Sequence, residues 1–154
     1  MDTNLTRFAS DEYAKNVENH PYHRLFNKPA ILSLMPTLQG LHVLDAGCGT
    51  GWFTEYFVSQ GATVTGLDIS EQMVERTKTR LEVVNPTANV TKEGVANLPP
   101  RVPTANIIQA NLAEPLQLEN ESFDLILSSL TLHYLESWKL TFSEFNRILK
   151  TFLS

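Results

Sequence analysis

The stretch LHVLDAGCGTGWF (residues 41–53) constrains the fold of this chain more than any other part of the sequence. A short apolar run meets Asp45, and three glycines then follow at alternate positions, Gly47, Gly49 and Gly51. Glycine loses more backbone entropy on folding than any other residue, so such a cluster indicates a sharp bend or the close approach of a ligand. We therefore expect a strand, a glycine turn and then a helix.

The rest of the chain alternates between strand and helix patterns. Strands are predicted for ATVTGLDIS (62–70), ANIIQANL (105–112) and SFDLILSSL (122–130), and helices for residues 52–60, 71–84 and roughly 137–150. Ser70 can cap the helix that follows it. The apolar run from Leu125 to Leu127 is typical of a strand covered on both faces. This alternation predicts an α/β fold with a mostly parallel sheet, whose ligands bind beyond the carboxyl ends of the strands.

Two regions are expected to lie beside this sheet. In residues 1–40, Asp11 can cap a short helix that ends at Val17, and apolar residues after Pro29 predict a second helix that Gly40 closes. Residues 85–104 contain four prolines and form an unusually long connection for a compact domain. We interpret them as an insertion, either mobile or folded into a short helix, within one domain that spans residues 1–154.

Composition excludes several classes of protein. The chain has 154 residues and a formal net charge of -5 without a basic block, which argues against a nucleic-acid or anionic-membrane partner. No apolar run has the length of a membrane span, and the first residues lack a signal-peptide core, so we expect a soluble, cytoplasmic domain. Cys48 is the only cysteine, which excludes an intramolecular disulfide and a cysteine-rich metal site.

The glycine turn does not fit the two common phosphate-binding patterns. Dinucleotide binding requires a small residue at the third position of G-x-G-x-x-G/A, and Trp52 stands there when counting starts at Gly47. The P-loop pattern fails because no Gly-Lys-Ser/Thr follows. The sequence has D-x-G-x-G-x-G instead, with the acid before the glycines.

Three segments together resemble one family. VLDAGCGTG resembles the first signature of class I S-adenosylmethionine-dependent methyltransferases, VTGLDIS resembles their second signature, and SFDLILSSLTLHYLESW resembles the fourth-strand region of their small-molecule branch. Order and spacing agree over roughly residues 13–150. The resemblance implies a Rossmann-like fold with the sheet order 3-2-1-4 and S-adenosylmethionine as the cofactor.

The resemblance also implies a role for each candidate cofactor residue. Gly47, Gly49 and Gly51, with Cys48 between them, would let the backbone pass close to the cofactor. Asp45 would orient the methionine amino group, and Asp68 would accept hydrogen bonds from the ribose hydroxyls. The remaining candidates surround the adenine or the methionine part: Ile69, Met73, Asn111, Leu112 and Ser128. Asn111 stands where the family usually has an aspartate, and its amide oxygen can still accept the same bond.

Several of these residues have a second interpretation that the sequence leaves open. Asp68 can instead cap a helix together with Ser70, and the Cys48 side chain is expected to act mainly in packing. Tyr13 and Tyr22 lie in a segment that often covers the cofactor in this family, although ordinary surface packing fits them as well. His133 follows the fourth strand and is the candidate general base, with loop packing as the alternative.

The resemblance further limits the reaction. Methylation of exocyclic base amines usually goes with an Asn/Asp-Pro-Pro-aromatic motif after the fourth strand, and that place is occupied here by Ser128, Ser129, Leu130 and Thr131. We therefore expect a small-molecule acceptor and no nucleic acid. Paired carboxylates that would hold magnesium are missing at the corresponding positions, so no metal is expected.

The match to the family stops soon after the last predicted helix. EFNRILK (144–150) is followed by TFLS, where the family continues into Pro-Gly-Gly and a fifth strand. We expect strands five to seven to be missing, which leaves the fourth strand as an apolar edge that could pair in a homodimer. A stable monomer in sedimentation would contradict this pairing. The alternative to an active enzyme is a non-catalytic module that binds S-adenosylmethionine or a partner.

Overall fold

The computed structural model describes Asn16 and residues 20–84 and 104–151. The prediction for Tyr13, the predicted helix from Asp11 to Val17 except Asn16, and the predicted insertion except Thr104 lie outside these residues. The chain divides into two compact units, residues 1–38 and residues 39–154, which are described separately below. Among the described residues, no helix combines the length and the apolar character that crossing a membrane requires.

The first unit contains a short helical segment. A π-helical turn, η1 (His23–Asn27), leads directly into α2 (Lys28–Ser33). The sequence predicted that this helix would extend to Gly40, and that prediction is wrong. The helix ends at Ser33 because Pro36 lacks an N–H group and disfavours the helical conformation of the residue before it.

The second unit contains a four-stranded parallel sheet. Its strands are β1 (His42–Ala46), β2 (Thr63–Asp68), β3 (Ala105–Gln109) and β4 (Leu125–Leu127), and their order is β3-β2-β1-β4. This is the order that the sequence predicted. The register places Ala46, the last residue of β1, beside Leu67, one residue before the end of β2, so both strands end at the same edge of the sheet.

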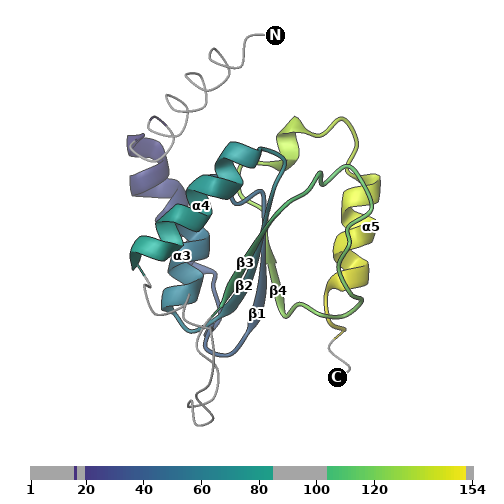
Figure 1. The fold of residues 1–154 in the computed structure, drawn as a ribbon, viewed down its shortest axis with the longest axis horizontal. Coiled ribbons are helices and arrows are strands. Elements are labelled where there is room, and N and C mark those ends of the chain that lie inside the picture. Colours follow the sequence, from purple (N-terminus) through teal and green to yellow (C-terminus); the bar gives the residue numbers. More distant parts are fainter. Residues whose placement is uncertain (1–15, 17–19, 85–103, 152–154) are drawn as a thin grey trace. The chain divides into compact units, whose positions relative to one another are not determined.

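Helices cover both faces of this sheet (Figure 1). The helices α3 (Trp52–Ser59) and α4 (Glu71–Val84) lie on one face, and α5 (Lys139–Ile148) lies on the other. The core on the α5 side consists of buried apolar residues from β1, β2, α5 and the connection between β3 and β4: Leu44, Ala46, Leu67, Leu112, Leu116, Phe123 and Ile148. Because side chains alternate along a strand, Asp45 points toward the other face.

The region of the fourth strand differs from its prediction in length. β4 has three residues instead of the nine predicted, and a separate bridge joins Phe123 to Leu149. All three residues of β4 are half-buried, which corrects the expectation of a strand covered completely on both faces. β4 is the last strand of the described sheet on this side, and a short 3-10 turn, η2 (Leu132–Tyr134), follows it.

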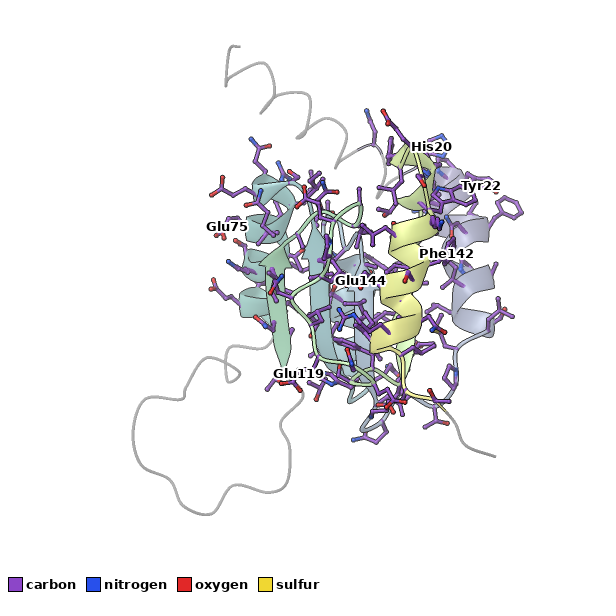
Figure 2. The ribbon with its side chains drawn as sticks, turned by 90° about the vertical axis from the view of Figure 1, so that its right-hand side faces the viewer. His20, Tyr22, Glu75, Glu119, Phe142 and Glu144 are labelled. Atoms are coloured by element: carbon purple, nitrogen blue, oxygen red, sulfur yellow. The ribbon has the colours of Figure 1, made fainter. Side chains whose placement is uncertain are left out.

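A charged cluster fastens α5 to the connection between β3 and β4. The Glu144 carboxylate on α5 (Figure 2) accepts hydrogen bonds from the Leu116 N–H at 2.8 Å and from two nitrogens of Arg147 at 2.7 and 3.0 Å. The Arg147 guanidinium also donates to the carbonyl groups of Leu116 and Leu118. Mainly because of the hydrogen bonds from Arg147, the pKa of Glu144 is lowered to about 2.

Glu144→Gln is expected to destabilise the fold in a pH-dependent manner. The folded-state pKa of Glu144 lies below its usual value of 4.5. The stability that the ionised Glu144 carboxylate adds to the folded protein is therefore fully present above about pH 4.5 and is lost as the pH falls toward about 2. We expect the variant to lose about 1–3 kcal/mol of unfolding free energy at pH 7. Urea denaturation at pH 7 and at pH 3 measures this difference, which should shrink by more than half at the lower pH.

Glu75→Gln is the matched control. Glu75 pairs with Lys78 on the exposed surface of α4 (Figure 2), and such pairs contribute less than about 1 kcal/mol. An equal loss of stability in both variants, or a Glu144→Gln effect that is the same at pH 7 and pH 3, would contradict the assigned role of Glu144.

Candidate functional site

A cavity of about 490 Å³ lies at the carboxyl ends of the strands. Its walls come from the turn after β1, the end of β2, the segment after β3 and the segment after β4. The lining residues are Gly47, Asp68, Ile69, Ala110, Asn111, Leu112, Ala113, Thr131, Tyr134, Leu135, Glu136, Ser137 and Leu140. Ligands of open parallel sheets bind at this edge, as the sequence predicted for this chain.

The glycine turn between β1 and α3 has the conformation that requires glycine. Gly47, Gly49 and Gly51 have φ angles of 85°, 55° and 83°. A Cβ atom on Gly47 would collide with the side chain of Thr131, whereas a Cβ atom on Gly49 would have nothing within 4 Å. Gly47 is therefore needed for packing as well as for its backbone angle, while Gly49 faces open space beside the turn.

Asp68 ties the end of β2 to this turn. One of its carboxylate oxygens accepts a hydrogen bond from the Gly49 N–H, and the other accepts one from the Ser70 N–H, both at 2.9 Å. Asp68 therefore lines the cavity and also bonds the residue before α4, as the capping alternative requires, while its contact with the ribose hydroxyls stays a prediction. A carboxylate has about four acceptor positions, so two are left for a ligand. The Ser70 hydroxyl accepts the Met73 N–H at 3.4 Å, as expected for a helix cap.

Asp45 is buried on the face of the sheet that α3 covers. Its side chain accepts a hydrogen bond from the Thr54 hydroxyl at 2.6 Å, and only 2% of the residue is exposed. Burial raises the pKa of Asp45 from 3.8 to about 6. Asp45 is not one of the residues that line the cavity, so a direct contact between its carboxylate and a ligand stays a prediction.

The other predicted cofactor residues are divided between the cavity wall and the layer behind it. Asn111, Leu112 and Ile69 line the cavity. The Asn111 side chain accepts the Ala113 N–H at 3.0 Å and donates to Glu114 at 3.1 Å, which fixes its orientation just after β3. Met73 is buried and does not reach the cavity lining.

Three further candidates lie near the cavity without lining it. The Ser128 hydroxyl donates to the Ala46 carbonyl at 2.9 Å, and His133 is exposed in η2 with its ring centroid 4.0 Å from that of Tyr134. The Cys48 thiol is buried, and burial, followed by the nearby charges of Asp45 and Asp68, raises its pKa. A raised pKa disfavours the reactive thiolate, which agrees with the expected packing role.

The segment after β4 contributes cavity residues that the sequence did not single out. Thr131, Tyr134 and Leu135 line the cavity, and Glu136, Ser137 and Leu140 continue the same wall. Leu130 has a φ of 58°, and this left-handed residue turns the chain so that Thr131 lies against Gly47. The family resemblance of SFDLILSSLTLHYLESW was the only sequence signal that marked this region as part of a site.

The comparison with protein families identifies one matching domain. Residues 44–151 match the model described as a methyltransferase domain. This match covers the glycine turn, Asp68, Asn111 and the segment after β4, which together form the cavity.

Among the described residues, no group of three or more His, Cys, Asp or Glu side chains is arranged to hold a metal ion.

Individual relatives agree with the family match. A malonyl-[acyl-carrier protein] O-methyltransferase of Erwinia billingiae is 30% identical over 110 residues, which are 71% of this chain and 35% of that protein. A ubiquinone biosynthesis O-methyltransferase of Coxiella burnetii is 48% identical over 46 residues, which are 30% of this chain and 20% of that protein.

Solved structures show the same similarity. An S-adenosylmethionine dependent methyltransferase from Mesorhizobium loti aligns with a TM-score of 0.61 and 32% identity, covering 79% of this chain and 48% of that one. The chain thus spans about half, or less, of the length of each of these three relatives.

The buried Asp45 should titrate well above an ordinary aspartate. The folded protein retains its proton between about pH 4 and 6 while the unfolded chain loses it, so unfolding free energy falls as pH rises through this range. In Asp45→Asn this dependence is absent. The stability of the variant relative to the native protein should therefore increase by about 2 kcal/mol between pH 4 and pH 7. Carbon-13 NMR titration of the Asp45 carboxyl tests the cause directly, and a midpoint near 3.8 would contradict it.

The two glycines should differ in their tolerance of a methyl group. Gly49→Ala is expected to cost about 1–2 kcal/mol of unfolding free energy, because only the left-handed backbone angle opposes it. Gly47→Ala adds a collision with Thr131, which we expect to cost about 1–3 kcal/mol more. Urea denaturation measures both variants. The added cost of Gly47→Ala should become smaller in a Thr131→Ala background, and equal costs at both positions would show that the collision is unimportant.

Proposed function

This chain belongs to the methyltransferase domain family, and we propose that it binds S-adenosylmethionine in the cavity described above and transfers its methyl group to a small-molecule acceptor. The observation that carries this proposal is the position of Asp68. Its carboxylate lines the cavity at the end of β2 and is bonded to the glycine turn that follows β1. The family membership and the S-adenosylmethionine-dependent enzymes among the structural relatives support the same cofactor.

The residues of the cavity fit this cofactor chemically. Asp68 offers free acceptor positions to a pair of hydroxyl groups, and Asn111 follows the strand adjacent to the one that Asp68 ends. Ile69 and Leu112 supply apolar surface suited to an aromatic base. Gly49 is not one of the residues that line the cavity, but the open space beside it lets a ligand approach the main chain of the turn closely.

Methyl transfer from S-adenosylmethionine mainly requires the protein to align the methyl donor with the acceptor. S-adenosylmethionine supplies a methyl group on a positively charged sulfur, which is already activated for in-line displacement. The task of the chain is to hold donor and acceptor in line and to exclude water. The wall formed by Thr131, Tyr134 and Leu135 after β4 is suited to this task because it bounds the same cavity as Asp68.

The acceptor is the part of the proposal that the relatives support only by analogy. Their names refer to malonyl-[acyl-carrier protein] and to ubiquinone biosynthesis, which favours a carboxylate or an aromatic hydroxyl over a nucleic-acid base. If the acceptor must lose a proton, His133 is the proposed general base. We also propose that the outer edge of β4 pairs with a second copy of the chain.

Calorimetry with S-adenosylmethionine and with S-adenosylhomocysteine tests the proposed function before the acceptor is known. We expect both ligands to bind the native chain and Asp68→Asn to weaken binding by about tenfold or more, because the amide loses the charge and half of the acceptor oxygens. Glu82→Gln removes a charge from an exposed position on α4 and serves as the control. No binding to the native chain at millimolar ligand would overturn the proposal.

Turnover is then measured with a panel of carboxylate and phenolic acceptors. Transfer of a labelled methyl group supports the enzyme, and His133→Ala should lower the rate at saturating acceptor if His133 acts as the base. Binding without transfer to any acceptor would favour a module that only binds the cofactor.

A further inference from the structure

Thr77 on α4 makes an unusual hydrogen bond for a threonine inside a helix. The residue is completely buried, and its hydroxyl donates to the Gly49 carbonyl at 2.9 Å, 28 residues earlier in the chain. Serine and threonine hydroxyls inside helices commonly bond the carbonyl four residues before them. Thr79, in the same helix, does this with the Glu75 carbonyl at 2.9 Å. The Thr77 hydroxyl is therefore committed to the glycine turn.

With this bond, both main-chain polar groups of Gly49 are hydrogen-bonded to side chains of other segments. The Gly49 N–H donates to Asp68 at 2.9 Å, and the Gly49 carbonyl accepts from Thr77, so both main-chain groups of one residue are held. Gly49 has a φ of 55°, and it has no side chain whose packing could fix it. Its orientation consequently depends on these two hydrogen bonds.

Thr77 also packs against two further residues of the turn, Cys48 before Gly49 and Gly51 after it. A Cβ atom on Gly51 would collide with the Thr77 side chain, and the Cys48 sulfur lies 3.8 Å from the Thr77 oxygen. One side chain of α4 thus packs against three residues of the turn. Because a buried polar group without a hydrogen-bond partner lowers the stability of the fold, the buried Thr77 hydroxyl strongly favours the conformation in which it bonds the Gly49 carbonyl.

We propose that Thr77 is a positioning residue for cofactor binding, which acts by holding Gly49 in the orientation that presents its N–H to Asp68. This inference rests on the proposed function. Loss of the hydroxyl removes one of the two bonds that hold the Gly49 main chain. Because glycine tolerates a wide range of φ and ψ, the residue can then shift, and the bond from its N–H to Asp68 is weakened. Asp68 would lose one of the two main-chain contacts that orient its carboxylate and keep only the bond from the Ser70 N–H, and the turn would lose the shape that admits the ligand.

Thr77→Val tests this role because valine keeps the shape and removes the donor, and Thr77→Ser restores the donor. In the ligand-free protein, the Gly49 amide signal in a proton–nitrogen NMR spectrum should shift in Thr77→Val and stay near its native position in Thr77→Ser. Calorimetry with S-adenosylhomocysteine should show binding weakened by about tenfold in Thr77→Val and close to native in Thr77→Ser. Thr79→Val, two residues along the same helix, is the matched control and should change neither measurement.

The outcomes separate this inference from the proposed function. Absence of binding to the native chain contradicts the proposed function itself. Native binding with unchanged affinity in Thr77→Val overturns the positioning role, even if the Gly49 signal moves, because Thr77 would then only support the fold. If Thr77→Val does not fold, Thr77→Ala and Thr77→Ser decide the question: weak binding in the first and native binding in the second support the role, and equal binding in both overturns it.

Discussion

The hydrogen bond between Asp68 and the Gly49 N–H is the contact on which the site depends. It joins the end of β2 to the turn that follows β1, and two further bonds from the N–H groups of Gly47 and Cys48 to the Leu67 carbonyl strengthen the same connection. These contacts are possible because β1 and β2 are parallel neighbours whose carboxyl ends are in register. The cavity lies between this connected pair of strand ends and the segments that follow β3 and β4.

Three threonines from different parts of the second unit surround the glycine turn. Thr54 on α3 bonds Asp45 just before the turn, Thr77 on α4 bonds Gly49 within it, and Thr131 after β4 packs against Gly47. Each satisfies a polar group close to the turn or fills the space left by a glycine. A turn that needs positive φ angles is thus held by three neighbouring segments, which compensates for the freedom of its glycines.

Much of the fold could be predicted from the sequence because its signals are local. The 14 residues of α4 begin after a capping serine and continue up to Val84, as predicted, and the sheet order agrees with the family resemblance of the strand motifs. The error at α2 also has a local cause, since Pro36 ends a helix whose apolar pattern continues beyond it. The length of β4 could not be predicted, because a continuous apolar run looks the same whether or not it is paired along its whole length.

The sequence by itself determined the glycine turn, the acid before it, the acid at the end of the second strand and the family to which they belong. Those features are fixed by backbone angles and residue chemistry at single positions. Only the tertiary structure decided that the buried Asp45 carboxylate bonds Thr54, that Asp68 holds the turn, and that a further wall of the cavity comes from the segment after β4. These contacts join residues between 9 and 84 positions apart, and their partners are set by how strands pair and helices pack, which no local pattern in the chain encodes.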